Sequence, residues 1–285
     1  MGYKQFGYFC LMKWLKRIFD FYIDASIHVA FAIYALLQIT FQTLNISYDY
    51  HLSFFIFFGS ISCYNFIKYG VEAEKYILVA NQYHKGIQFF SFIALSFALY
   101  HGYFLSFDVW AGVGGLLFLT GLYALPVLPK AKNLRSWGGL KIFVVALVWA
   151  GATVLLPVLS ANQLITWDIG VETFQRFVVI LILLIPFEIR DLAYDKVELR
   201  TLPQRYGVTN TKIFGGFATL VFFFGTFLMD DLSVEEVVLK GVLFLILGSM
   251  LYMTKRNQSK YFTSFWVEAI PIGWWGLMLV LPRCS

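Results

Sequence analysis

The segment that decides the fold spans residues 186–207 and reads PFEIRDLAYDKVELRTLPQRYG. It directly follows the apolar run 177–185. On an α-helix Glu188, Asp191 and Asp195 stand at positions i, i+3 and i+7 and therefore share one face. Three like charges on one face repel each other, and a hard divalent ion such as Mg²⁺ bridging phosphate oxygens relieves that repulsion. The spacing predicts a metal and phosphate site.

Basic residues accompany these carboxylates, and they suit an anionic phosphate ligand. They are Arg190, Lys196, Arg200 and Arg205. Pro203 and Gly207 are expected to break the helix before the next apolar run.

The composition places the chain among membrane proteins. Of 285 residues, 59% are hydrophobic and 14% are charged, and the mean hydropathy is +0.70. A soluble domain carries about 25% charged residues. We expect an all-α integral membrane protein forming one domain over residues 1–285. Nine spans are predicted, at 18–40, 52–70, 87–107, 109–128, 138–160, 170–188, 213–230, 237–254 and 264–282.

The basic residues fall unevenly between the two predicted faces. Nearly all of the 22 Lys and Arg lie at the N-terminus or in the loops after the even-numbered spans, and the exceptions are Arg176, Lys240 and Arg283. Such asymmetry predicts a cytoplasmic N-terminus, a cytoplasmic 186–207 segment and a C-terminus on the far side. Because the positive charge is distributed among loops, we do not expect a nucleic-acid partner.

Two parts of the chain resemble the UbiA superfamily of intramembrane prenyltransferases. The sharper match is to the second acidic motif of that family and its basic tail, through Glu188-Ile-Arg-Asp191, Asp195-Lys196 and Arg200-Thr201-Leu202-Pro203. The second match is to the passage from its fourth to its fifth helix, through Leu122 to Pro126, Lys130 to Arg135, Leu140-Lys141 and Trp149-Ala150.

The resemblance implies nine helices around a central cavity open to the cytoplasm, in which a polyprenyl diphosphate donates its chain to a lipophilic or aromatic acceptor. It implies that Glu188, Asp191 and Asp195 hold Mg²⁺, and that Lys141, Arg200 and Arg205 contact phosphate. Tyr194 is expected near the developing carbocation. Asp191, Asp195 and Tyr194 are the candidate catalytic residues.

The chain departs from the family at its first acidic motif, Asn-Asp-x-x-Asp-x-x-x-Asp. Asn65 matches the asparagine, but the three aspartate positions are Phe66, Tyr69 and Ala73. A cation can replace part of the missing metal charge, so one hypothesis pairs Lys68 with Glu188, Asp191 or Asp195, directly or through a phosphate. The alternative is that Lys68 only extends to the membrane interface.

Several further polar residues fall inside predicted spans, where ionisable groups are costly and face a cavity or a partner. Asp20, Asp24 and His28 stand four residues apart and would line one stripe, with Asp24 pairing with His28 or binding an acceptor. Asn65 is expected to face inward and to help bind substrate, and Glu268 is a further buried acid.

Three functions remain open at this point. The first is prenyl transfer. The second is a non-catalytic UbiA-like protein that binds an isoprenoid, a quinone-like lipid or a partner protein, which the altered first motif favours. The third is a small transporter, although the two halves show no matching broken helices. The acceptor, the prenyl length and the oligomeric state are left open.

Overall fold

The computed structural model describes residues 2–71, 82–124, 140–195 and 199–280. These residues form helices and connecting segments, with no β-strand among them. The all-helical prediction is confirmed for this part of the chain. The remaining candidates from the sequence, such as Lys130, Lys132, Arg135 and Lys196, lie outside the described residues.

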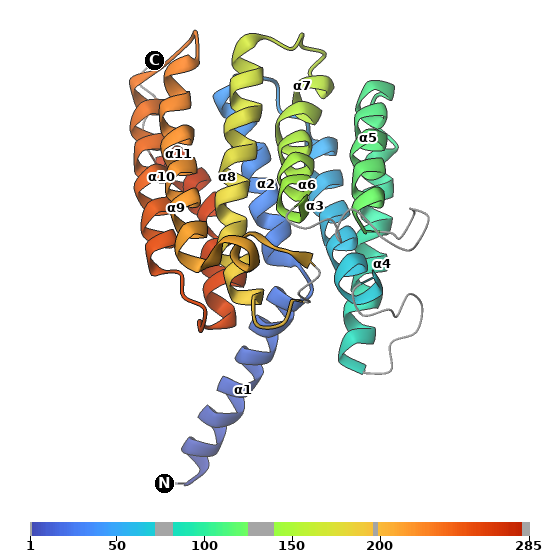
Figure 1. The fold of residues 1–285 in the computed structure, drawn as a ribbon. Coiled ribbons are helices and arrows are strands. Elements are labelled where there is room, and N and C mark those ends of the chain that lie inside the picture. Colours follow the sequence, from blue (N-terminus) through green and yellow to red (C-terminus); the bar gives the residue numbers. More distant parts are fainter. Residues whose placement is uncertain (1, 72–81, 125–139, 196–198, 281–285) are drawn as a thin grey trace.

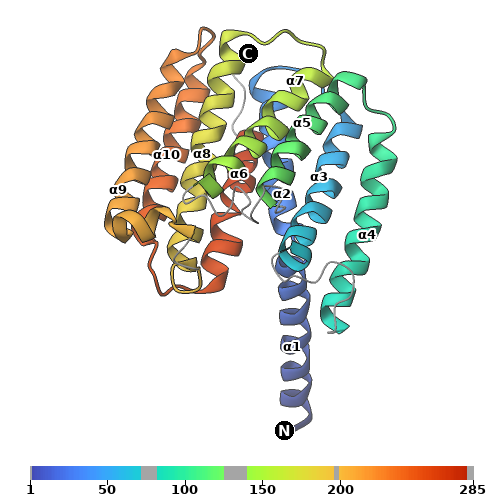
Figure 2. The same ribbon diagram turned by 45° about the vertical axis from the view of Figure 1, so that its right-hand side comes forward.

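The helices stand side by side in one bundle, from which the first helix projects (Figures 1 and 2). The α-helices are α1 Gly2–Asp24, α2 Ile27–Thr43, α3 Tyr50–Asn65, α4 Gln82–Gly102, α5 Phe107–Ala124, α6 Leu140–Ala150, α7 Leu156–Ser160, α8 Trp167–Asp191, α9 Leu202–Gly225, α10 Val234–Met253 and α11 Ile270–Val280. A short 3-10 segment, η5 Thr226–Leu228, extends α9.

Three segments widen into π-helix, a geometry that often marks functional sites. They are η1 Phe66–Val71 after α3, η3 Gly151–Leu155 between α6 and α7, and η6 Phe262–Val267 before α11. The first two continue longer helical runs, so α3 with η1, and α6 with η3 and α7, form single rods.

Four helical rods are long and apolar enough to cross a membrane: Tyr50–Tyr69, Leu140–Ser160, Trp167–Asp191 and Leu202–Leu228. Met12–Asp24 and Ile27–Thr43 together make a fifth if their bent pair is one span. The chain is therefore a helical protein with four to five candidate membrane spans. Helical segments also overlap the other predicted ranges, but α10, for example, carries Glu235, Glu236 and Lys240 in its first two turns.

The predicted span 18–40 is not one continuous helix. Helix α1 ends at Asp24 and α2 begins at Ile27, with a bend of 55° between them. Ser26 adopts the left-handed conformation at φ 59°, which interrupts the helical hydrogen bonds. Asp24 and His28 therefore do not share a helical face, and the predicted stripe is wrong because it assumed unbroken periodicity.

Helix α8 is the central helix, and it carries a buried network of charges. Arg176 donates to Glu172 at 2.7 Å, to the Leu36 carbonyl at 2.7 Å and to Thr40 at 3.1 Å. Lys240 of α10 lies 3.3 Å from the second Glu172 oxygen and 2.6 Å from Glu236. Two of the three basic residues that the sequence analysis set on the far face, Arg176 and Lys240, thus lie inside the bundle, where acids neutralise them.

Candidate functional site

The 186–207 segment forms the end of α8, a short connection and the start of α9 (Figure 1). We call this end of the bundle the motif end. Pro203 was expected to break a helix, but it stands in the first turn of α9, where a missing N–H is tolerated. Gly207 does interrupt α9, at φ 77° and ψ 165°.

Glu188 is the most deeply placed carboxylate of the segment and pairs with a lysine. It is 2% exposed, and its Oε1 atom lies 3.6 Å from Nζ of Lys141, at the start of α6. Oε1 makes no hydrogen bond with any described residue. A residue predicted to bind phosphate thus neutralises a residue predicted to bind metal.

Asp191 is bound by its neighbour Arg190. Nε and Nη2 of Arg190 donate to the two carboxylate oxygens of Asp191 at 2.7 and 3.1 Å. The same guanidinium donates through Nη1 to Thr263 at 2.7 Å and to Ser264 at 3.2 Å. Arg190 therefore ties the end of α8 to η6, in addition to neutralising Asp191.

The predicted metal ligands have protein partners in this arrangement. Among the described residues, no group of three or more His, Cys, Asp or Glu side chains is placed to hold a metal ion. Glu188 is paired with a lysine and Asp191 with an arginine. A metal ion at these carboxylates would compete with Lys141 and Arg190, which pair with them in this conformation.

The other residues predicted from this segment lie at the surface. Tyr194 is 87% exposed, which does not suit a role beside a carbocation inside a cavity. Arg200 and Arg205 are also exposed, and Arg200 has a left-handed backbone at φ 44°. A surface location leaves both guanidinium groups accessible to an anion approaching from solution.

Asn65 faces inward as predicted, but its hydrogen bonds go to the protein. Its amide donates to the Ala25 carbonyl and to Ser91 Oγ, both at 2.9 Å, and accepts from Ser26 Oγ at 2.8 Å. These contacts hold the α1–α2 bend against α3 and α4. The structure assigns Asn65 a structural role that the motif match alone did not indicate.

Asp24 and Lys68, two predicted binding residues, do meet at the α1–α2 bend. Lys68 Nζ donates to the Asp24 carbonyl at 3.2 Å, and Tyr69 donates to the same carbonyl at 2.9 Å. The Asp24 side chain accepts from Tyr83 at 3.1 Å. The expected partner His28 instead bonds Tyr22 at 2.8 Å and the Phe265 carbonyl at 2.9 Å.

A second polar group at the motif end joins α1 to the segment before η6. Tyr261 donates to Asp20 at 2.6 Å, and Lys260 lies 3.3 Å from the same oxygen. Donation to a carboxylate favours the protonated phenol, so this bond raises the pKa of Tyr261.

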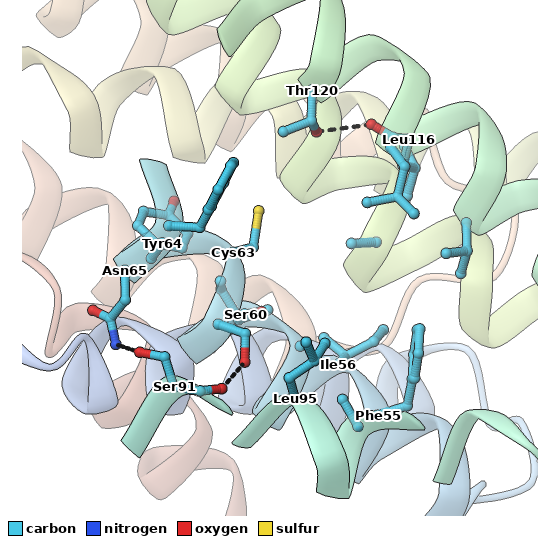
Figure 3. Close-up of a pocket in the computed structure, with 18 of the residues that line it drawn as sticks. Phe55, Ile56, Ser60, Cys63, Tyr64, Asn65, Ser91, Leu95, Leu116 and Thr120 are labelled. Carbon is cyan, nitrogen blue, oxygen red and sulfur yellow. Dashed lines mark hydrogen bonds between the residues drawn. The ribbon is translucent and has the colours of Figure 1, made fainter. Parts of the chain in front are cut away.

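A large apolar groove lies between α3, α4, α5 and the α6–η3 rod (Figure 3). Its volume is about 630 Å³, within the usual range of ligand pockets. Its walls include Phe55, Ile56, Leu95, Leu116 and Trp149, and the polar groups of Asn65 and Ser91 lie at its motif end. The sequence did not indicate which residues line it, since the groove depends on which helices are neighbours.

Comparisons with protein-family models, with curated proteins and with solved structures each found no match.

Proposed function

We propose that this chain is a UbiA-like membrane protein of nine spans that binds a polyprenyl diphosphate and transfers the chain to a lipophilic or aromatic acceptor. The isoprenoid would lie in the apolar groove. The diphosphate would lie at the motif end, near Lys141 and the basic residues of the 186–207 segment.

The observation that carries this proposal is that one helical rod carries both a lysine at the motif end and residues that line the groove. Lys141 stands in the first turn of α6 at the motif end. Val148, Trp149 and Ala152 follow on the same rod and line the groove. Val148 stands seven positions after Lys141 along the helix, a rise of about 10 Å. A ligand with an anionic head and a long apolar tail matches this order of cation and groove.

The charge distribution bears on how the chain is oriented in the membrane. Arg176 and Lys240, which lie toward the opposite end of the bundle, are buried and paired with acids, so they do not count as free positive charge against the basic residues at the motif end. We propose that the motif end and the N-terminus face the cytoplasm, where positive loops are retained.

A second candidate is prenyl-lipid binding without transfer. It is favoured by the pairing of Glu188 with Lys141 and of Asp191 with Arg190, because these pairs occupy the carboxylates that a metal-assisted transfer needs. Phe66 and Tyr69, at two aspartate positions of the first motif, favour it as well.

The test is binding of a non-hydrolysable geranylgeranyl diphosphate analogue to the purified full-length protein, with and without Mg²⁺, in wild type and Asp191→Ala. Saturable binding supports the lipid-binding core of the proposal, and Mg²⁺-dependent binding lost in Asp191→Ala supports a diphosphate site suited to transfer. Binding that ignores both Mg²⁺ and Asp191 favours the second candidate. Absence of binding contradicts both.

A further inference from the structure

Two histidines from neighbouring helices face each other at the end of the bundle opposite the motif end, where α3 begins and α4 ends (Figures 1 and 2). The Nδ1 atoms of His51 and His101 lie 3.2 Å apart, within hydrogen-bond distance. His101 is 6% exposed, whereas His51 is only half-buried and can be reached by solvent. Both residues lie outside the 186–207 segment and outside the lining of the groove.

Aromatic rings hold both imidazoles in place. His51 stacks on Phe104 with ring centroids 4.2 Å apart, and His101 stacks on Phe54 with centroids 5.4 Å apart. The Tyr50 ring stands edge-on to both imidazoles, with centroids 5.4 Å from His51 and 5.3 Å from His101. Turning either imidazole away would give up these contacts, so the packing keeps the two Nδ1 atoms facing each other.

The helices around the pair supply almost no charge. Residues 27–43, 50–65, 90–102 and 107–124 contain no Lys or Arg, and their one acid is Asp108, which is exposed. Asp49 precedes α3, but its carboxylate already accepts from the Leu52 N–H at 2.9 Å and from the Ser160 hydroxyl. The other titratable neighbours are tyrosines such as Tyr50 and Tyr100, which are neutral at the pH where an imidazole titrates. A positive charge on the pair therefore has no acid poised to neutralise it.

The facing Nδ1 atoms limit how many protons the pair can hold. In the neutral pair one Nδ1–H donates to the bare Nδ1 of the other ring. A first added proton binds Nε2 of the donor ring and leaves this hydrogen bond intact. A second must bind the accepting Nδ1, which sets two N–H groups and two positive charges against each other. In acid the packed pair thus holds one proton fewer than two free imidazoles, so its contribution to stability falls as the pH drops below about 6.5.

The pair lies beside one end of the groove. Gly102 follows His101, and its carbonyl accepts from Trp110 Nε1 at 2.9 Å. A Cβ atom at Gly102 would meet the Trp110 ring at 2.9 Å and the Phe55 ring at 3.2 Å, and both rings line the groove. The backbone next to His101 therefore packs directly on the groove wall, and a shift of α4 relative to α3 at this point moves that wall.

We propose that His51 and His101 form a pH-sensitive latch, which joins the start of α3 to the end of α4 at neutral pH and releases them in acid. Release loosens the end of the groove at Phe55 and Trp110. In the orientation proposed above, this end faces away from the cytoplasm, so the latch responds to the external pH. The side of the membrane and any effect on an isoprenoid tail rest on the proposed function, whereas the latch itself does not.

The test measures the separation of the two helix ends without any ligand. Spin labels are attached to cysteines introduced at Ser47 and Tyr103, two exposed positions just before α3 and just after α4, after the three native cysteines are replaced by serine. Pulsed electron paramagnetic resonance on the full-length protein in nanodiscs gives the distance at about pH 7.5 and about pH 5, on either side of the imidazole pKa. We expect a longer and broader distance distribution at the lower pH.

His51→Gln and His101→Gln should each remove this pH response, because an amide does not take up the proton. Thermal unfolding is the second readout. One proton of linkage changes the unfolding constant about tenfold per pH unit, so the midpoint of the parent protein should fall more steeply in acid than those of the two Gln variants. If one Gln variant does not fold, the other decides alone.

His84→Gln, near the opposite end of α4, is the matched control and should keep the full pH response. A distance that ignores pH in the parent protein, or that shifts equally in the parent and in both Gln variants, overturns the inference. A latch response in a protein that binds no prenyl diphosphate analogue would overturn the proposed function alone. Binding of that analogue without a pH-dependent distance would overturn the latch alone.

Discussion

The Lys141 ammonium lies 3.6 Å from the Glu188 carboxylate and joins the start of α6 to the end of α8. The pair brings together two residues that the sequence assigned to different parts of one ligand site. With Glu188 neutralised by lysine, the motif end can tolerate a buried carboxylate without a metal. The same geometry places the lysine at the end of the rod that lines the groove.

Replacing Lys141 by Met should destabilise the protein, because it leaves Glu188 buried without its cation. We expect a loss of about 1–3 kcal/mol, below the roughly 3–5 kcal/mol for a fully buried pair, since the Lys141 side chain is 24% exposed. A double-mutant cycle with Glu188→Gln, followed by thermal melting, measures the coupling. A coupling energy near zero would show that the contact does not contribute.

Asn65→Leu should destabilise the protein by about 2–3 kcal/mol, because it removes hydrogen bonds to Ala25, Ser26 and Ser91 at the α1–α2 bend. Thermal melting checks this. Gly59→Ala is the control on the same helix, since an added Cβ there meets no atom within 4 Å and should not lower stability. If both variants melt like wild type, Asn65 is free to serve a ligand instead.

Lys240→Met should be strongly destabilising, by about 3–5 kcal/mol, because Glu172 and Glu236 would lose a buried partner. Lys255→Met, at an exposed position, should change stability by less than about 0.5 kcal/mol. Unfolding in mixed micelles compares the two variants. Similar unfolding midpoints for Lys240→Met and Lys255→Met would contradict a structural role for the buried network.

Gly59→Trp should block the groove, because Gly59 lines it and its Cβ position faces open space. We expect at least tenfold weaker binding of a geranylgeranyl diphosphate analogue, with a smaller effect on a dimethylallyl analogue, whose short tail fills less of the groove. Gly114→Trp is the matched control, since its Cβ is equally open but it lies outside the groove. Equal affinity of the Gly59→Trp and Gly114→Trp variants for the geranylgeranyl analogue would show that its isoprenoid tail binds outside the groove.

The position of a site residue on its helix could be predicted from nearby sequence, whereas its contact partners could not. The sequence placed Asn65 on an inward face and put Glu188 on one face with Asp191 and Asp195, because the face of a helix that a residue occupies follows from its spacing to neighbours a few residues away. It could not give their partners. Lys141, Ser26 and Ser91 are distant in the chain, and contacts with them depend on which helices pack together. Tyr194 follows the last turn of α8 and is exposed, which the spacing of the motif alone did not indicate.

By itself the sequence determined that the chain is apolar and helical, and where the acidic segment falls, because hydropathy and charge spacing are local sums along the chain. Only the tertiary structure decided the 55° bend at Ser26, the cations that neutralise Glu188 and Asp191, and the groove. Each of these depends on the packing of separate helices, and side chains from different helices become neighbours only when the bundle closes.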